Sequence, residues 1–265
     1  MPDVHICEIV KIEKFPGKSL CGDRLSDYVA CSIVVSCPEI AKEARAGQFV
    51  HIKCDESLVL RRPFGICSVS GDEVRFVFEV KGDGTRLLLE RKPGDLLDIL
   101  GPLGNGFNIP DGGVIVAGGG LGTPPMLFAA ESAAGNVAAV LGFRDSGRVM
   151  LTSEFEAVCD KVYLTTDDGS AGLHGLVTNP LEELLKTGMY SCVLSCGQYA
   201  MLSAVAKLCE SYKVPCQVSL EERMGCGVGA CLVCACATRE DGVEKMSRVC
   251  RDGPVFDAGD VVWKV

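Results

Sequence analysis

The stretch Met224–Cys250, MGCGVGACLVCACATREDGVEKMSRVC, contains four cysteines whose spacing decides the interpretation of this chain. Cys226, Cys231 and Cys234 follow the pattern C-x4-C-x2-C, and Cys250 follows as a distant fourth. This spacing is typical of plant-type [2Fe–2S] clusters, which are held by four cysteine thiolates. We therefore predict that these four cysteines bind a [2Fe–2S] cluster.

Glycines in the same stretch support that prediction. Gly225, Gly227 and Gly229 let the backbone fold around a cluster, because glycine reaches positive φ without steric cost. Zinc with four thiolates is the alternative, but zinc sites usually have two C-x2–4-C pairs and the second pair is missing here. Cys236 is a competing ligand, which we rank below Cys234 because Cys234 completes the spacing.

Length and composition predict two domains and a small C-terminal module. The chain has 265 residues, of which 48% are hydrophobic, and can bury a full core. Its net charge of −9 argues against nucleic acid and membranes as partners. We see no signal peptide and no apolar run near the roughly 20 residues of a membrane span. Sixteen cysteines in such a chain favour a reducing cytoplasm, with most of them buried as small hydrophobes.

Residues 1–104 contain short β-rich runs separated by turns. Residues 73–81, for example, alternate apolar and polar side chains with period two, as antiparallel strands with one solvated face do. Six such runs predict a small closed antiparallel barrel. They cover residues 4–15, 27–37, 47–54, 64–70, 73–81 and 95–104.

Residues 105–217 change to alternating strands and helices. Strand-like segments such as 112–120 and 190–197 are each followed by an apolar, helix-like segment. This alternation predicts a doubly wound parallel sheet with helices on both faces. Residues 218–265 then form the module that carries the four cysteines.

Two motifs of the barrel region suit a flavin. In Arg61-Arg62-Pro63-Phe64-Gly65, a guanidinium can hold a pyrophosphate and Phe64 can lie against an aromatic ring. In Lys81-Gly82-Asp83-Gly84-Thr85-Arg86, a glycine turn opens a helix whose free N–H groups favour a phosphate. Arginine pairs and glycine turns are common on surfaces, so each motif alone is a weak signal. Together they predict a flavin site on the barrel.

The segment after Val114–Ala117 suits a nucleotide. A strand that enters a glycine-rich turn and then a helix is the phosphate-binding corner of nucleotide-binding folds, or else simply a tight turn. The candidate residues are Gly118, Gly119, Gly120 and Gly122; Thr123 stands where a third motif glycine would fall.

Two later strand ends can complete the nucleotide site. Asp145 can bind a ribose hydroxyl and Arg144 a 2′-phosphate, which leaves NAD and NADP both open. Ser195-Cys196-Gly197-Gln198 places small groups where a nicotinamide could approach a flavin, although Cys196 can equally be structural.

The order of these motifs resembles the ferredoxin–NADP reductase superfamily along the whole chain. The segments SLEERMGCGVGACLVC and VCRDGPVFDAGDVV are similar to the electron-transfer subunits of NAD-dependent class 1B dihydroorotate dehydrogenases. The resemblance implies FAD on the barrel, NAD on the second domain and one [2Fe–2S] cluster. It also implies a partner subunit with FMN that oxidises dihydroorotate to orotate in pyrimidine synthesis, in a heterotetramer with two copies of each chain.

Carried over position by position, the resemblance also implies the flavin contacts. One departure is Gly65, where the family usually has serine, so we expect an altered flavin potential or affinity. The implied contacts are Arg62, Pro63, Phe64, Gly65, Val77, Phe78, Glu79, Gly84 and Thr85.

Cofactor chemistry predicts the division of labour. A cluster moves one electron, a nicotinamide accepts a hydride, and a flavin does both, so FAD is the expected converter. No catalytic acid or base is apparent, and His5, His51 and His174 are interpreted as core or surface residues.

Electron transfer to FMN requires that the partner cover the cluster. We therefore expect the apolar side chains beside the ligands at the interface, and the alternative is that they only pack beneath the cluster. These side chains are Val228, Ala230, Leu232 and Val233.

Three other functions stay open. The chain could be the flavoprotein subunit of an NAD(P)H–ferredoxin transhydrogenase or a sulfide dehydrogenase, which shares this architecture. It could also be a non-enzymatic redox sensor, or a binding module stabilised by zinc.

Overall fold

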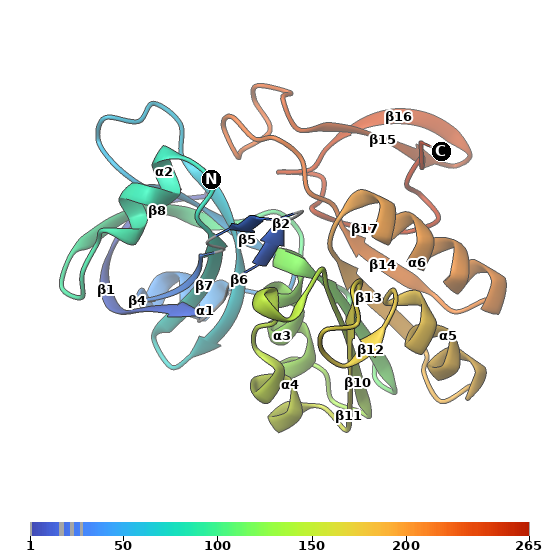
Figure 1. The fold of residues 1–265 in the computed structure, drawn as a ribbon. Helices are drawn as coiled ribbons and strands as arrows, with labels where there is room; N and C mark the ends of the chain where they lie inside the picture. The colour runs from blue at the N-terminus through green and yellow to red at the C-terminus, as the bar shows by residue number, and fades with distance from the viewer. Residues whose placement is uncertain (1, 16–18, 22–23, 27–28, 265) are drawn as a thin grey trace.

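A closed barrel of six antiparallel strands forms the N-terminal part of the molecule (Figure 1). The computed structural model describes residues 2–264 except 16–18, 22–23 and 27–28, so residues 27–28 of the predicted run 27–37 lie outside the description. The strand order β1-β4-β7-β6-β5-β8 confirms the predicted barrel. The bounds are Val4–Phe15 (β1), Ala30–Ser36 (β4), Phe49–Lys53 (β5), Arg62–Ser70 (β6), Glu73–Glu79 (β7) and Leu96–Leu103 (β8).

The interior of the barrel is filled by apolar side chains from its own strands. Every second residue of β8 is buried, beginning at Leu97, because successive side chains of a strand point to opposite faces. Ile33, Ile52 and Phe76, from three other strands, are fully buried in the same core. The short elements of this region are β2 (Ser19–Cys21), β3 (Arg24–Ser26), α1 (Pro38–Glu43) and α2 (Asp83–Leu89).

A seven-stranded sheet follows, in the order β12-β11-β10-β9-β13-β14-β17. The first six strands pair in parallel, and β17 joins β14 antiparallel at the edge. The parallel strands are Val114–Gly119 (β9), Val137–Phe143 (β10), Lys161–Thr166 (β11), Leu173–His174 (β12), Cys192–Cys196 (β13) and Cys216–Ser219 (β14), and β17 is Val255–Asp257. The helices are Thr123–Glu131 (α3), Thr152–Val158 (α4), Thr178–Lys186 (α5) and Tyr199–Tyr212 (α6), with 3-10 turns at Gly120–Gly122 and Ser146–Arg148.

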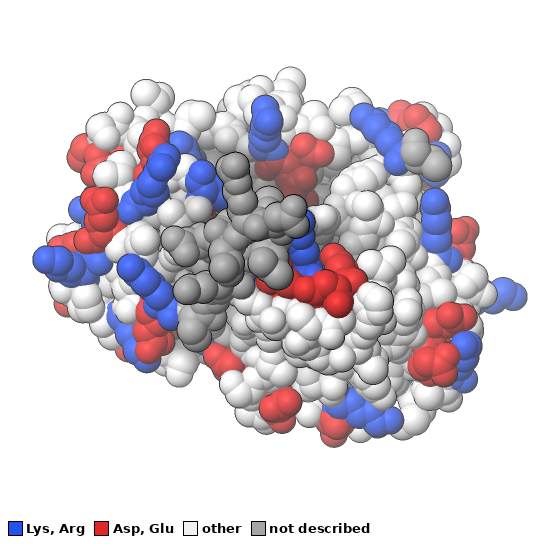
Figure 2. All heavy atoms as spheres, in the orientation of Figure 1, with Lys and Arg blue, Asp and Glu red and all other residues white. Residues whose placement is uncertain are grey.

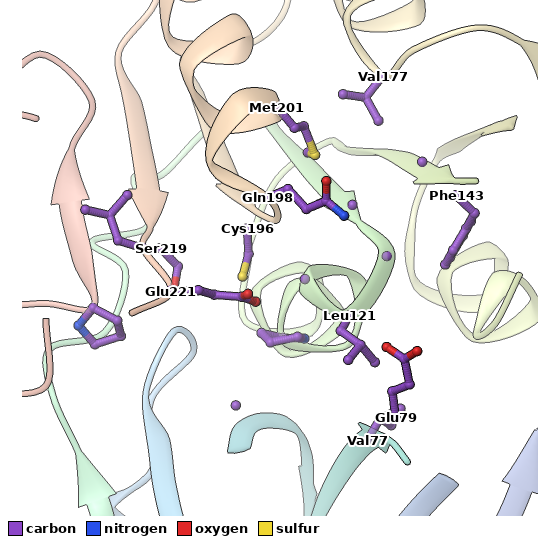
Figure 3. Close-up of a pocket in the computed structure, with 18 of the residues that line it drawn as sticks. Val77, Glu79, Leu121, Phe143, Val177, Cys196, Gln198, Met201, Ser219 and Glu221 are labelled. Atoms are coloured by element: carbon purple, nitrogen blue, oxygen red, sulfur yellow. The ribbon is translucent and has the colours of Figure 1, made fainter. Parts of the chain in front are cut away.

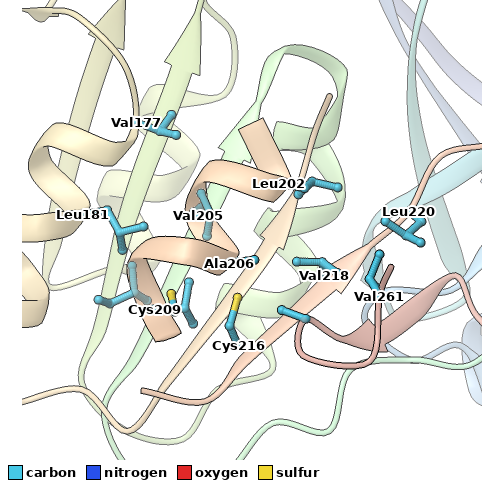
Figure 4. Close-up of a cluster of buried hydrophobic side chains, with 14 of the residues drawn as sticks. Val177, Leu181, Leu202, Val205, Ala206, Cys209, Cys216, Val218, Leu220 and Val261 are labelled. Atoms are coloured by element: carbon cyan, nitrogen blue, oxygen red, sulfur yellow. The ribbon is translucent and has the colours of Figure 1, made fainter. Parts of the chain in front are cut away.

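Two apolar clusters cover the two faces of this sheet, which confirms the doubly wound prediction. Met126 of α3 and Phe155 of α4 are fully buried in one cluster. Leu181 of α5 and Val205 of α6 are fully buried in the other, shown in Figure 4. Strands covered on both faces read as continuous apolar runs, and every residue of β13 is buried.

The C-terminal segment is anchored on the sheet. A hairpin of β15 (Ala235–Glu240) and β16 (Val243–Arg248) turns at Asp241 and Gly242, both with positive φ, as tight hairpin turns require. After the hairpin the chain returns as β17, an edge strand that the sequence pattern did not indicate. Cys234 and Cys250 belong to the apolar cluster beneath α5 and α6. The three-domain division at residues 104 and 217 stays a prediction.

Charged side chains are dispersed over the surface. On the face in Figure 2, acidic and basic residues are interspersed among uncharged ones over the described part of the chain, without a continuous basic strip. None of the described helices combines the length and the apolar character needed to cross a membrane.

Candidate cofactor sites

The loop before β15 directs backbone N–H groups at the predicted cluster ligands. The N–H groups of Val228 and Ala230 donate to Cys226 Sγ at 3.5 and 3.3 Å. The N–H of Gly229 donates to Cys250 Sγ at 3.1 Å. Hydrogen bonds of this kind stabilise charge on sulfur and tune the potential of a bound cluster.

The curvature of the loop depends on left-handed backbone. Gly227 has φ +73° and Gly229 has φ +83°, a region that side chains disfavour. A Cβ on Gly225 would lie 3.2 Å from Cys231 Sγ, closer than most real contacts. The glycines singled out from the sequence are therefore needed for backbone shape and for space beside a ligand.

The four thiols lie in two pairs. The side chain of Cys226 hydrogen-bonds that of Cys231, and the side chain of Cys250 hydrogen-bonds that of Cys234. Among the described residues, no three or more His, Cys, Asp or Glu side chains gather around one metal-ion position. Zinc takes four ligands at one point, whereas the four thiolates of a [2Fe–2S] cluster are shared between two irons. The two thiol pairs therefore fit a [2Fe–2S] cluster, in which each iron binds two thiolates.

The environment of Cys226 favours its thiolate. Desolvation raises the pKa of this thiol, but hydrogen bonds from the N–H groups of Val228, Cys231 and Ala230 and from the Cys231 side chain outweigh that effect and lower the pKa to about 6. A thiolate is the form that binds iron. Cys236, the competing ligand, packs against the apolar core, and burial raises its pKa to about 11.

An ion pair between Arg248 and Asp252 is hydrogen-bonded to the backbone of the cysteine-containing loop. Arg248 donates from Nε and Nη2 to the Asp252 carboxylate, both at 2.9 Å, and from Nη1 to the Gly229 carbonyl at 3.3 Å. The Arg248 guanidinium is the first cause that lowers the pKa of Asp252. The Asn105 side chain, just after β8, donates to the Asp252 carbonyl at 3.0 Å, which ties the barrel to the segment holding Cys250.

A cavity of about 1000 Å³ lies between the barrel, the sheet and the C-terminal segment. Figure 3 shows Val77 and Glu79 of β7 on one side of it and Met201 of α6 on another, with Leu121 between them. This volume lies at the upper end of ligand pockets, as a large flavin and nucleotide require. The predicted residues that line it are Pro63, Phe64, Gly65, Val77, Phe78, Glu79, Gly119, Gly120 and Gly122.

The remaining predicted flavin contacts lie together outside this lining. Arg62 packs against the first turn of α2, where a Cβ on Gly84 would lie 3.2 Å from its Nε. The Thr85 hydroxyl accepts hydrogen bonds from the N–H groups of Lys81 and Gly82 at 2.9 and 3.2 Å. The structure thus brings Arg62, Gly84 and Thr85 into one group at the start of α2.

The structure accounts for Gly65 in place of serine. A Cβ at this position would lie 2.6 Å from Cγ of Pro125 in α3. The proline ring fills the space that a serine side chain would need. The barrel and the sheet domain therefore touch more closely here than a serine would allow.

Some glycines of the turn after β9 allow close packing, and others leave space in the cavity. A Cβ on Gly122 would meet the Cys196 carbonyl oxygen, and one on Gly119 would meet Met201 Sδ. Gly118 lies outside the cavity lining, because its backbone packs against Thr123. Gly120 has φ +55° and open space beside it, so it leaves room for a ligand.

Cys196 and Glu221 lie next to each other in the cavity wall (Figure 3). Burial raises the pKa of the Cys196 thiol, and the Glu221 charge adds to that effect. Desolvation also raises the pKa of Glu221, although its carboxylate faces the open cavity, and Lys81 acts in the opposite direction. Our sequence reasoning did not identify Glu221; its place just after β14, at the carboxyl end of a parallel strand, was the available signal.

Arg144 and Asp145, the two candidates for nucleotide specificity, follow β10 and differ in exposure. Arg144 is exposed and lines the cavity. Asp145 is buried; it accepts a hydrogen bond from the Gly147 N–H at 3.0 Å and pairs with Arg148 at 3.7 Å. The basic side chain is therefore the one that reaches the cavity.

Apolar side chains surround the cluster loop at the surface. Val228, Leu232 and Val233 are 39%, 62% and 56% exposed, and Ala230 and Cys231 are exposed as well. The alternative that these side chains only pack beneath the cluster does not match this exposure. An exposed apolar rim is typical of a surface that a partner covers.

Known proteins resemble this chain in its C-terminal segment and along most of its length. Residues 221–262 match the iron-sulfur cluster binding domain of dihydroorotate dehydrogenase B. The electron transfer subunit of dihydroorotate dehydrogenase B (NAD(+)) from Caldanaerobacter subterraneus subsp. tengcongensis is 42% identical over 84% of this chain and 89% of its own. The subunit of that name from Clostridium perfringens is 40% identical over 94% and 98%.

Solved structures share the fold. A structure described as an NADH-dependent reduced ferredoxin-NADP oxidoreductase has a TM-score of 0.81 and 30% identity, and the match covers 99% of this chain and 92% of that one. A ferredoxin NADP+ reductase from Neisseria gonorrhoeae, with bound FAD and NADP, has a TM-score of 0.58 and 17% identity over 79% and 91%. The curated relatives cover most of both lengths at about 40% identity. The chain belongs to the family of electron transfer subunits of dihydroorotate dehydrogenase B (NAD(+)).

Proposed function

We propose that this chain carries electrons from an FMN-containing subunit, which oxidises dihydroorotate to orotate in pyrimidine synthesis, to NAD+. The observation that carries the proposal is the combination, in one chain, of two thiol pairs at an exposed apolar surface with a large cavity between barrel and sheet. The names of relatives about 40% identical support the same function.

The thiol pairs and their loop hold the iron–sulfur centre. When bound, a [2Fe–2S] cluster moves single electrons, FAD exchanges single electrons for a hydride, and NAD+ accepts the hydride. Cys226, Cys231, Cys234 and Cys250 supply the thiolates. The loop N–H groups that already point at Cys226 and Cys250 stabilise negative charge on the sulfur atoms.

The cavity walls bind the flavin and the nicotinamide nucleotide. Phe64, with its exposed fraction of only 7%, and Pro63 provide an apolar wall for a flavin ring. The open turn at Gly120 and the exposed Arg144 suit phosphate groups of a nucleotide. We assign Arg62, Gly84 and Thr85 to the flavin pyrophosphate, which their common place at α2 supports.

The partner covers the rim of Val228, Leu232 and Val233. We propose a heterotetramer with two copies of each subunit, which places each cluster at a contact with the FMN-containing chain. We also propose a reducing cytoplasm as its location, which the free thiols of the described cysteines support.

The test uses the purified chain with and without the FMN-containing subunit. Alone, it is expected to hold FAD and a cluster and to reduce artificial dyes with NADH, but not to oxidise dihydroorotate. With the partner added, dihydroorotate is expected to reduce NAD+. Turnover of dihydroorotate by the isolated chain, or no NAD+ reduction by the reconstituted complex, contradicts the proposal. Reduction of ferredoxin by the isolated chain at the rate of dye reduction would favour the transhydrogenase class instead.

A further inference from the structure

His51 of β5 is a buried polar residue that the proposed function does not use. Its exposed fraction is 0%, and neither ring nitrogen has a hydrogen-bond partner among the described residues. Desolvation, followed by the charges of Arg61 and Arg62, lowers its pKa to about 4. Near pH 7 the ring is thus neutral, with one N–H donor and one acceptor nitrogen. A buried polar group without a hydrogen bond is unfavourable, so a hydrogen-bond partner is expected for this ring.

The ring of His51 lies against the cluster loop. A Cβ on Gly227 would be 2.9 Å from both Cε1 and Nδ1 of His51 and 3.1 Å from Cγ. The edge of the ring that carries Nδ1 therefore faces the backbone next to Cys226. Gly227 is the residue that allows this approach, since any side chain there would displace the imidazole.

A residue of the cavity wall also contacts the His51 ring. Phe49 lines the cavity, and its ring meets the His51 ring edge-on with centroids 5.8 Å apart. His51 itself does not line the cavity. The imidazole therefore lies between the cavity wall and the cluster loop, with its Nδ1 edge toward the loop.

We propose that His51 is a positioning residue for the iron–sulfur centre, whose imidazole N–H donates a hydrogen bond to a sulfur atom of the bound cluster. The inference rests on the cluster assigned under the proposed function. The Nδ1 edge of the His51 ring faces the cluster loop, and a bound cluster brings sulfur acceptors to that loop. Phe49, not His51, lines the cavity assigned to the flavin. Donation to sulfur raises a cluster's potential, because the reduced cluster carries more negative charge.

The first test needs no substitution. The chain contains His5, His51 and His174, of which His174 is exposed on β12. Protein labelled with 15N-histidine is reduced with dithionite and studied by pulsed EPR. We expect a weak 15N coupling to the reduced cluster, with an exchangeable proton in D2O. The coupling should persist in His174→Gln, which serves as the matched control.

The second test measures the potential of the cluster. His51→Leu removes the donor and should move the one-electron equilibrium about tenfold toward the oxidised cluster, which is ~59 mV. His51→Asn keeps an N–H at the position of Nδ1 and should recover most of the shift. The FAD potential in the same samples should stay at the value of His174→Gln.

The outcomes separate the two proposals. A reducible cluster without histidine coupling in the unsubstituted protein would overturn the role of His51 and leave the proposed function intact. A potential in His51→Leu equal to that of His174→Gln would overturn it as well. A protein with zinc and no EPR signal would contradict the proposed function and the inference together.

Discussion

The cluster loop and the flavin cavity are built in opposite ways. Three of the four proposed cluster ligands come from one short loop, and Leu232 beside them is 62% exposed. The cavity takes its walls from the barrel, the sheet and the C-terminal segment, and Phe64 within it is 7% exposed. A site made by one loop depends on that loop's own residues. A site made by several elements depends on how those elements fit together, and a defect in one can be repaired in another.

The largest effect is expected from removing a loop ligand. Cys231→Ala leaves one thiol pair with a single member, so the cluster should be lost. Because metal binding and folding are coupled, the C-terminal segment should also become less stable. Iron, acid-labile sulfide and the visible spectrum measure the loss.

Cys236→Ala is the matched control for that experiment. Cys236 packs against the apolar core, so its loss should leave the iron content unchanged. If Cys231→Ala still held a cluster, with Cys236 as the replacement ligand, a residue outside the loop would be able to replace a loop ligand. The contrast with the cavity would then be wrong.

The loop's dependence on glycine should give the next largest effect. Gly227→Ala combines a positive φ with contact to the His51 ring at 2.9 Å, and should lower the free energy of unfolding by about 2–4 kcal/mol. Gly242→Ala has a similar φ of +79° but open space, and should lower it by only about 1 kcal/mol. Thermal unfolding of both variants measures the difference. Equal losses would show that the His51 contact has no energetic weight.

At the cavity, a substitution in one element should be compensated by a substitution in another element. Gly65→Ser places a side chain against Pro125, which should lower stability by about 1–3 kcal/mol and weaken FAD retention. Pro125→Ala in the same protein removes the obstructing ring and should restore both. Gly259→Ser, at a position with open space, is the control. If the double variant were as unstable, and retained as little FAD, as Gly65→Ser alone, the contact between β6 and α3 would not be the cause of the defect.

The smallest effect on the isolated chain is expected at the exposed rim of the loop. Val228→Glu places a charge on a side chain that is 39% exposed, so FAD, cluster and dye reduction should be retained. Affinity for the FMN-containing subunit should fall by about 1–2 kcal/mol, roughly tenfold, because interface cores exclude charge. Loss of the cluster with unchanged association would place Val228 inside the loop's packing instead.

Sequence patterns predicted the parts whose causes are local. Short β-rich runs, several of them alternating with period two, indicated the six barrel strands. The spacing of Cys226, Cys231 and Cys234 indicated the cluster ligands, an assignment that stays a prediction. Helix α5 was missed, although TNPLEELLK is amphipathic, because no glycine motif drew attention to it. The pairing of β17 with β14 depends on a long-range contact between Val218 and Phe256, which no local pattern encodes.

The candidate site divides in the same way. Phe64 and Gly120 were predicted from motifs, and both line the cavity. The environments of Glu221 and of the His51 ring depend on segments distant in sequence, because Glu221 lies beside Cys196 and His51 lies against Gly227. The role of Gly65 depends likewise on Pro125, which belongs to another part of the fold.

Communication between the two regions is the central claim, and NADH titration of the isolated chain tests it most directly. Under anaerobic conditions NADH should bleach the flavin absorbance and also produce the EPR signal of a reduced [2Fe–2S] cluster, without any partner. Dithionite defines the full signal in the same sample. A cluster that dithionite reduces and NADH does not, while NADH reduces the flavin, would contradict the account.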